Sequence, residues 1–266
     1  MADPIPSPGA SVHPEHDAVS REVRSWYTAP VPEVGLDGAA HWFGFACMTG
    51  TDRARVVLSI SEPAQVPAAL AAARGACTAA SFTVMVDDRD RADRLDAALR
   101  EHGCTYSEST TYLALIGSMA PSPLAPDRLE VARVETAELD AWARVKLRCF
   151  ADSEDAPTAD EVAADVAERR RELPLAEYQL GLLDGEPVAV LAHYPGADDL
   201  VFILGTRTPY RHRGIAQTML ARWAASAAGA RSLIINAREG GAPAALYQRL
   251  GFTDEVYWYS RYELSR

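Results

Sequence analysis

A short basic stretch at residues 210–216, Tyr-Arg-His-Arg-Gly-Ile-Ala, constrains the fold of this chain more than any other feature. Before it, residues 201–204 are apolar and bounded by turn residues, which predicts a buried strand. After it, apolar residues recur at helical spacing from Met219 to Ala227, so we predict a helix that begins near Gly214. A strand that turns through glycine into a helix leaves several backbone N–H groups unpaired and pointing the same way. Together with the positive end of the helix dipole, these groups form a site for phosphate oxygens.

The spacing within this stretch is Arg211-x-x-Gly214-x-Ala216. Gly214 lets a ligand approach the backbone closely, and Ala216 is small enough not to block it. Arg211 and Arg213 add positive charge at the mouth of the loop. A plain strand–helix connection with surface arginines is the alternative interpretation of these residues alone.

The segments after the loop favour the phosphate site. Residues 232–237 predict a second buried strand, and Pro243 suits the first turn of a short helix over residues 244–250. Gly251 then suits the left-handed position after a helix, with Phe252 packing back on the last turn. Strand, loop, helix, strand, helix and the Gly-Phe ending thus occur together and in order.

The Arg211-x-x-Gly214-x-Ala216 pattern resembles motif A of the GNAT N-acetyltransferase superfamily, which grips the pyrophosphate of acetyl-CoA. Asn236, followed by Ala-Leu-Tyr-x-x-x-Gly-Phe at residues 245–252, resembles motif B of the same family. The resemblance covers residues 128–266 and implies an α/β (α+β) GNAT-like fold, with a mixed central sheet flanked by helices. It also implies acetyl-CoA as cosubstrate, contacted by Leu204, Thr206, Arg211, His212, Arg213, Gly214, Ile215, Ala216 and Asn236.

The family pattern implies that the acetyl group lies between two splayed strands, here residues 201–206 and 233–236. A backbone N–H near Leu204 would polarise the thioester carbonyl, and Gly205 would ease a bulge there. We predict Tyr247 as the general acid for the CoA thiolate, because a phenol with a pKa near ~10 is protonated at neutral pH. A half-buried aromatic on a short helix is the alternative for Tyr247, and a strand-end turn residue is the alternative for Asn236.

The general base is not evident from the sequence, because residues 201–205 contain no ionisable side chain. His193, Asp198 and Asp199 are near in sequence, but we interpret each as a solvated loop residue or a strand-end polar group. The run of three arginines at residues 169–171 is interpreted as a solvated helix face.

The composition and net charge of the chain limit the kinds of partner that it can bind. The net charge of −11 argues against nucleic acid, whose phosphates would be repelled. No apolar stretch is long enough to span a membrane, and no signal peptide is evident, so we expect a cytoplasmic protein. The four cysteines are widely separated, which predicts reduced thiols, and no residue cluster has metal-ligand spacing. We therefore expect no metal, and a small-molecule or peptide amine as partner, with a homodimer left open.

The domain organisation is predicted from composition and from a weak internal repeat. We predict a flexible tail at residues 1–18 and an N-terminal domain at residues 19–118. A linker at residues 119–127 is predicted to join it to the catalytic domain at residues 128–266. Laid on the C-terminal part with a shift of 148 residues, the N-terminal domain matches it in element order, so we predict a tandem arrangement with a truncated first copy. An unrelated α/β domain is the alternative.

The first copy differs where the chemistry should be. Opposite residues 211–216 it has Pro-Ala-Gln-Val-Pro-Ala at residues 63–68, with no glycine to admit a phosphate. Pro67 also lacks a backbone N–H, and Leu99, opposite Tyr247, has no proton to give. We therefore predict a degenerate copy that keeps the fold and has lost the cofactor.

Local signals in the second unit are equally specific. Asp184-Gly185 predicts a tight hairpin, and Thr158 with Glu161 predicts a capping box. The function we predict is an acetyl-CoA-dependent N-acetyltransferase that acts by direct transfer. The alternatives are a non-catalytic acyl-CoA-binding or regulatory module, and an acyltransferase that uses a different acyl-CoA or a hydroxyl acceptor.

Overall fold

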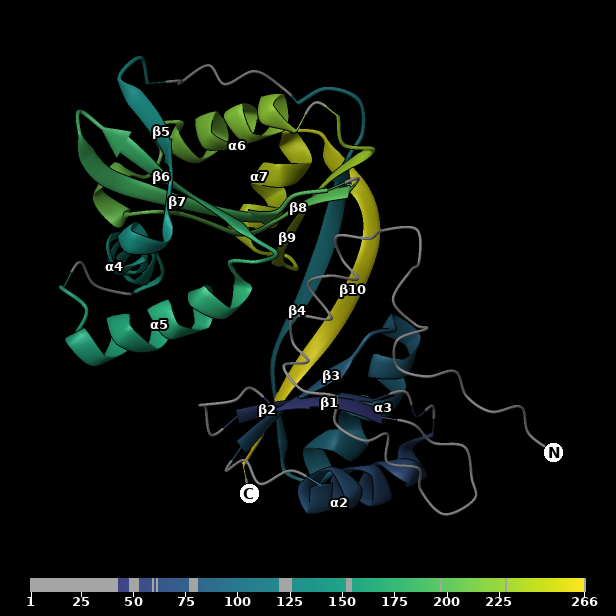
Figure 1. Ribbon diagram of the computed structural model, residues 1–266. Coiled ribbons are helices and arrows are strands. Elements are labelled where there is room, and N and C mark those ends of the chain that lie inside the picture. Colours follow the sequence, from purple (N-terminus) through teal and green to yellow (C-terminus); the bar gives the residue numbers. More distant parts are fainter. Residues whose placement is uncertain are drawn as a thin grey trace. The chain divides into compact units, whose positions relative to one another are not determined.

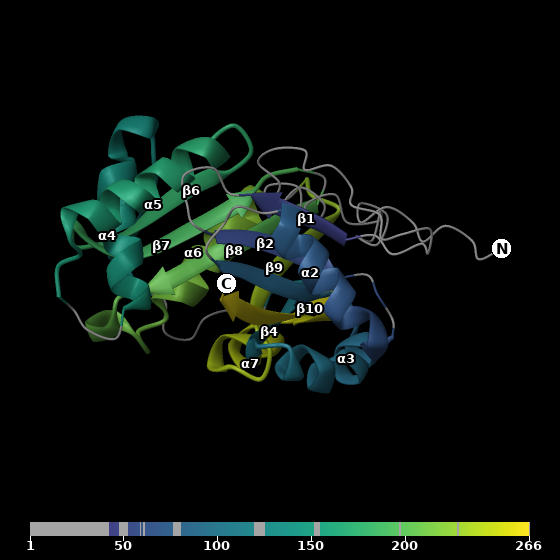
Figure 2. The ribbon, with the colours of Figure 1, turned by 90° about the horizontal axis from the view of Figure 1, so that it is seen from below.

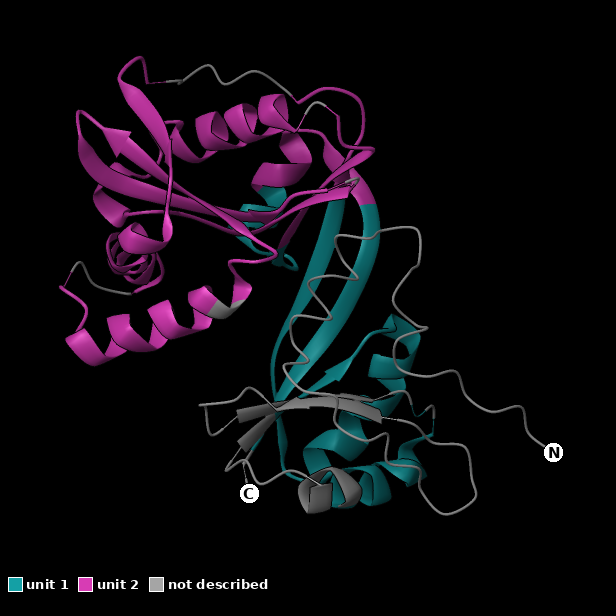
Figure 3. Ribbon diagram, viewed as in Figure 1, with its two compact units in different colours: residues 1–113, 237–245, 255–266 teal, residues 114–236, 246–254 magenta. Residues whose placement is uncertain are grey.

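The computed structural model describes residues 43–47, 53–58, 60, 62–76, 81–119, 126–151, 155–196, 198–227 and 229–265 (Figure 1). The predicted tail at residues 1–18 and most of the predicted linker at 119–127 lie outside these residues. The chain divides into two compact units, shown in Figure 3. Unit 1 comprises Met1–Leu113, Ala237–Ala245 and Glu255–Arg266, and unit 2 comprises Ala114–Asn236 and Leu246–Asp254.

These units differ from the predicted domains, because neither is continuous in sequence. The predicted catalytic domain extends to residue 266, whereas residues 255–266 belong to unit 1. The reason is strand pairing: Ser260–Ser265 of strand β10 pairs antiparallel with strand β3, Ser81–Val86. A C-terminal strand therefore completes the sheet that the N-terminal part begins.

Unit 2 is built on a mixed sheet with the strand order β9-β8-β7-β6-β5. Its strands are β5 (Leu129–Arg133), β6 (Glu177–Leu183), β7 (Glu186–Tyr194), β8 (Asp198–Thr206) and β9 (Ser232–Arg238). Neighbours from β5 to β8 pair antiparallel, and β8 pairs parallel with β9. The predicted hairpin between β6 and β7 is confirmed, since Asp184 and Gly185 both have positive φ, 54° and 82°.

Helices cover both faces of the unit 2 sheet, with α4 and α5 on one face and α6 on the other (Figures 1 and 2). The helices are α4 (Leu139–Phe150), α5 (Ala159–Glu172), α6 (Ile215–Ser226) and α7 (Ala242–Arg249), with 3₁₀ turns η3 (Thr136–Glu138) and η4 (Thr208–Tyr210). The predicted capping box of α5 is confirmed: Thr158 Oγ1 accepts from the Glu161 amide at 3.3 Å, and the Glu161 carboxylate accepts from the Thr158 amide at 2.8 Å. Trp142 of α4 and Trp223 of α6 are fully buried, so each helix anchors its face with an indole.

Gly205 of β8 permits the close approach of α4. A Cβ atom at this position would lie 2.7 Å from Cβ of Cys149 and 3.0 Å from the Phe150 ring. The strand is regular here, with Gly205 opposite Val190. The expectation that Gly205 eases a bulge is therefore wrong, because the glycine makes room for a helix.

We expect Gly205→Ala to lower the free energy of unfolding by about 1–3 kcal/mol, because the added methyl group overpacks the contact with α4. Gly229→Ala is the matched control, since no atom lies within 4 Å of a Cβ there. Denaturant unfolding followed by circular dichroism measures both. Equal unfolding midpoints for the two variants would contradict this packing role.

Unit 1 has the strand order β1-β2-β3-β10-β4. Its elements are β1 (Phe43–Cys47), β2 (Arg53–Leu58), η2 (Pro63–Gln65), α2 (Val66–Ala76), β3 (Ser81–Val86), α3 (Arg89–Glu101), β4 (Cys104–Leu115) and β10 (Phe252–Ser265). Its core is formed by one face of α2 and α3 packed on the sheet, with Leu70, Leu95, Leu99 and Val84 among the fully or almost fully buried side chains. The sequence also favours the start of a helix at residues 20–27 and a turn at residues 50–52, and both stretches lie outside the described residues.

The two units share an order of elements. In unit 1 a strand, a 3₁₀ turn, a helix and a parallel strand follow one another as β2-η2-α2-β3, and in unit 2 they do so as β8-η4-α6-β9. The shared order agrees with the predicted tandem arrangement, and the truncation of the first copy stays a prediction because residues 1–42 lie outside the described residues. In unit 1 the turn before the helix contains Pro63 and no glycine, so it lacks the residue that shapes the turn of unit 2, and Pro67 lies in the first turn of α2.

Candidate cofactor and catalytic site

The turn between β8 and α6 presents free backbone N–H groups. Helix α6 begins at Ile215, and its N-cap residue Gly214 has left-handed geometry, with φ 75° and ψ 2°. His212, two residues earlier, also has a positive φ of 62°. The predicted helix start near Gly214 is thus confirmed, and the glycine is there because the backbone is left-handed.

The amides of this turn fall into two groups. The amides of Tyr210 and Arg211 donate to Arg207 O at 2.9 Å and Thr208 O at 3.2 Å. From residue 212 to residue 216, no amide donates to a backbone carbonyl within the described part of the chain, and Gly214 offers no side-chain cap. Free amides at the positive end of a helix are the groups that bind phosphate oxygens.

The two arginines of the loop have different surroundings. Arg211 donates to Thr206 O at 3.1 Å and to Cys149 O at 2.8 Å, so it ties the loop to the ends of β8 and α4. The guanidinium carbon of Arg213 lies 5.3 Å from the centroid of the Tyr210 ring, whose hydroxyl donates to Glu186 at 2.6 Å. Arg211 therefore shapes the loop through backbone carbonyls, and Arg213 carries exposed positive charge above it.

Strands β8 and β9 separate part-way along. Their parallel register runs from Asp198 opposite Ser232 to Val201 opposite Ile235 and stops there. The edge of β8 that faces β9 is open from Phe202 to Thr206, and this open edge includes Leu204. The separation of β9 from β8 was predicted over residues 233–236, but it begins later. Leu233 and Ile235 are still paired with β8, and of the predicted residues only Asn236 follows the last pair.

A bulge in β8 coincides with this separation. In the β7–β8 register Ala192 is opposite Ile203, but His193 is opposite Val201, so Phe202 is the extra residue. Its ring stacks on Tyr194, with ring centroids 4.3 Å apart. The bulge predicted beside Leu204 therefore lies at Phe202, where an aromatic side chain fills the space that the irregularity opens.

Tyr247 lies on α7 and is buried, with its ring edge toward Phe252 at a centroid distance of 6.4 Å. Burial raises the pKa of the Tyr247 phenol above its ordinary value, because the phenolate would be poorly solvated. The phenol therefore stays protonated throughout the neutral range. Gly251, after this helix, has the predicted left-handed backbone with φ 106°, and Phe252 is fully buried.

No protein-family model matches the chain, and no curated protein matches it. Solved structures do. A GCN5-related N-acetyltransferase from Kribbella flavida aligns with a TM-score of 0.60 at 19% identity, over 92% of this chain and 93% of that one. A second, from Sphaerobacter thermophilus, has a TM-score of 0.60 at 17% identity, over 93% and 85%. This chain has the GNAT fold.

The tandem arrangement also has a solved counterpart. A tandem GNAT protein from the clavulanic acid biosynthesis pathway aligns with a TM-score of 0.57 at 15% identity, over 86% of this chain and 81% of that one. Because these alignments extend over most of each chain, the GNAT comparison includes unit 1 as well as unit 2. The fold class expected from the sequence is confirmed.

Within the GNAT fold of unit 2, the three candidate bases are buried. Of the two interpretations given for them, the solvated loop residue is wrong and the strand-end polar group is confirmed, because His193 lies near the end of β7 and Asp198 and Asp199 begin β8. Arg231 donates to both carboxylate oxygens of Asp198, at 2.7 and 3.1 Å.

Asp199 and His193 belong to a buried hydrogen-bonded group that the sequence analysis missed. His193 Nδ1 lies 2.7 Å from Asp199 Oδ1, which also accepts from the Trp223 indole at 2.8 Å. His193 Nε2 lies 3.8 Å from a carboxylate oxygen of Glu177. The available signal was Trp223, because a core indole needs an acceptor, but the acceptor lies 24 residues earlier in the chain.

Arg169 is a second correction, since it does not lie on a solvated face. It is buried and pairs with Glu172 at 2.6 Å and Glu168 at 2.8 Å, and the Tyr178 hydroxyl donates to Glu172 at 2.7 Å. Burial opposes its charge, but these two carboxylates hold the pKa of Arg169 above its ordinary value. Of the same run, Arg170 is exposed.

Three further observations concern classes of site. In the described residues, no group of three or more His, Cys, Asp or Glu side chains could hold a metal ion. None of the described helices has the length and apolar content to cross a membrane. Cys104 and Cys149 are buried, and neither forms a disulfide bond within the described residues.

Proposed function

We propose that the protein is an acetyl-CoA-dependent N-acetyltransferase that moves an acetyl group directly to the primary amine of a small molecule or peptide. The observation that carries the proposal is the turn before α6, where His212 and Gly214 are left-handed and, among the described residues, no backbone carbonyl accepts from the amides of residues 212–216. Such a turn suits the pyrophosphate of acetyl-CoA. In unit 1 the corresponding turn has no glycine, and Pro67 in the first turn of α2 has no N–H to donate, so one acetyl-CoA is proposed per chain.

The separation of β8 and β9 supports the placement of the acetyl group. Pairing ends at Val201 and Ile235, so the backbone of β8 from Phe202 onward is available to a ligand. Leu204 and Thr206 lie on this open stretch, and Asn236 is the first residue of β9 beyond the last pair. We assign the pantetheine arm to this gap, with a backbone N–H near Leu204 polarising the thioester carbonyl.

Tyr247 is assigned the role of general acid. Attack of the neutral amine on the thioester forms a tetrahedral intermediate, and its collapse breaks the C–S bond and expels the CoA thiolate. The protonated Tyr247 phenol donates its proton to this sulfur, and the amine proton leaves to solvent or to a base. The raised pKa of Tyr247 keeps the donor form populated at neutral pH, which is one requirement for this role.

The test is thiol release from acetyl-CoA over a panel of primary amines, followed with a thiol reagent and confirmed by mass spectrometry of the acetylated product. Amine-dependent release with an amide product is expected. Tight acetyl-CoA binding with no turnover on any amine would favour the non-catalytic acyl-CoA-binding module. Turnover only with longer acyl-CoA thioesters or with alcohols would favour the alternative acyltransferase.

A further inference from the structure

Unit 1 contains a cavity of about 320 Å³ that the proposed acetyl transfer does not use. It is lined by α3, β4, β10 and the turn after β9. Arg89, Asp93, Asp96 and Arg100 are spaced three or four residues apart on α3, so they share one helix face. Trp258, Ser260 and Tyr262 alternate along β10 and share one face of the strand.

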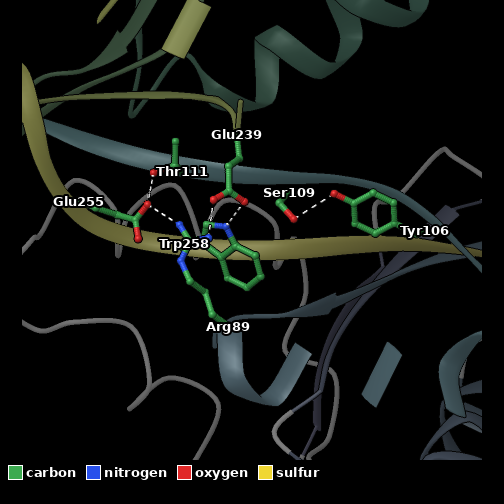
Figure 4. Close-up of polar contacts among 7 residues, drawn as sticks. All are labelled: Arg89, Tyr106, Ser109, Thr111, Glu239, Glu255 and Trp258. Carbon is green, nitrogen blue, oxygen red and sulfur yellow. Dashed lines mark hydrogen bonds and ion pairs between the residues drawn. The ribbon is translucent and has the colours of Figure 1, made fainter. Parts of the chain in front are cut away.

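The positive groups of the lining are already neutralised. Arg89 donates to Glu239 and, at 2.6 Å, to Glu255, and its guanidinium carbon lies 4.6 Å from the Trp258 ring centroid (Figure 4). The Trp258 indole donates to Glu239 at 2.8 Å. Arg100 donates to Asp96 at 2.8 Å. Neither arginine therefore offers an uncompensated charge to an anionic ligand.

The negative and polar groups are not all used. Asp93 is an exposed residue of the cavity lining and has no ion pair or hydrogen bond among the described residues. The Ser260 residue is 2% exposed, and its hydroxyl has no hydrogen-bond partner among the described residues. Three carboxylates and two guanidinium groups line the cavity, so its net charge is −1.

Three aromatic side chains, Tyr106, Trp258 and Tyr262, also line the cavity. Tyr106 and Tyr262 pack edge to face with centroids 5.6 Å apart, and Trp258 lies on the same face of β10 as Tyr262. The chain already places cations on these rings, since Arg100 lies 5.8 Å from the Tyr106 centroid and Arg89 lies over Trp258. Aromatic faces beside carboxylates are the surroundings that attract ammonium groups.

We propose that this cavity binds an organic cation, an ammonium group on a compact apolar body. The unpaired Asp93 carboxylate and the Ser260 hydroxyl receive the ammonium hydrogens, and the aromatic rings contact the apolar body. An anion is disfavoured by the net charge and by the pairing of both arginines. The proposal stands on unit 1 alone and does not depend on acetyl transfer in unit 2.

The test is an NMR titration of the full-length protein with phenethylamine, observing the Trp258 indole N–H resonance, which is identified by its absence in Trp258→Phe. The neutral 2-phenylethanol and the anionic 3-phenylpropionate are the matched probes. A saturable shift with the amine is expected, with at least about tenfold weaker binding of both analogues. Equal affinity for the alcohol, or no saturable shift up to about 10 mM amine, would overturn the proposal.

Two variants localise the binding. Asp93→Asn keeps the shape of the side chain and removes its charge, so amine affinity should fall by about fivefold. Asp90→Asn is the control, because it removes the same charge from the first turn of α3 and does not line the cavity. An equal loss of amine affinity in the two variants would show that only the overall charge of the protein matters, and it would contradict a site at Asp93.

Discussion

We expect Gly214→Asp to lower the affinity for acetyl-CoA by at least about 100-fold. The substitution puts a carboxylate at the N-cap of α6, where the pyrophosphate of acetyl-CoA is proposed to lie, so bulk and like charge oppose the ligand together. Isothermal titration calorimetry measures the effect. The parent protein should bind one acetyl-CoA per chain, and two equivalent sites would contradict the degenerate character of unit 1.

Gly117→Asp is a matched control for backbone strain. Gly117 has φ 76° against 75° for Gly214, and no atom lies within 4 Å of a Cβ there. Both variants pay the cost of about 1–2 kcal/mol for a left-handed non-glycine residue, but only Gly214→Asp changes the loop. Acetyl-CoA affinity in Gly214→Asp equal to that of the parent would show that the phosphate site is misplaced.

Tyr247→Phe should lower kcat by about 10²–10⁴-fold if departure of the thiolate limits the rate, because it removes the proposed general acid and keeps the ring. Acetyl-CoA affinity and fold should barely change, since the phenyl ring retains its contact with Phe252. Steady-state rates on any accepted amine, with acetyl-CoA affinity measured alongside, provide the comparison. A loss of only a few-fold would indicate that the amine's own proton or a water reaches the sulfur.

The pH dependence of the parent follows from the direction of the Tyr247 pKa shift. Burial raises this pKa above the ordinary value of about 10, so the donor form is present at every pH below that value. Ionisation of this phenol should therefore cause no fall in kcat between about pH 7 and pH 10.

Tyr178→Phe is the control for Tyr247→Phe, because it also removes a buried hydroxyl, and it should lower stability and leave kcat unchanged. Unchanged kcat in Tyr247→Phe would assign that residue to core packing.

Features that depend on neighbouring residues in the chain were predictable from the sequence. Asp184 and Gly185 form the hairpin turn because they accept positive φ, and Thr158 caps α5 because its partner Glu161 is three residues away. The same holds for the start of α6 after Gly214, where the left-handed backbone requires glycine. In each case the determining interaction spans a few residues, so its signal is present in a short window.

Features that depend on distant partners were decided only by the tertiary structure. The sequence around Arg169 looks like a solvated helix face, but the side chain is buried with Glu172 and the Tyr178 hydroxyl. His193 and Asp199 look like loop residues, but adjacent strands and the Trp223 indole from α6 enclose them. Local propensity cannot show such burial, because it depends on which elements pack together.

The assignment of the C-terminal strand has the same origin. The sequence by itself determined the order of elements in each unit and the turn that presents free amides before α6, since apolar periodicity and glycine are local properties. Only the tertiary structure placed Ser260–Ser265 beside Ser81–Val86, and only it brought Trp258 and Tyr262 to a cavity with Asp93. Strand pairing between segments about 180 residues apart is set by the closure of the whole sheet, and no short stretch of sequence encodes it.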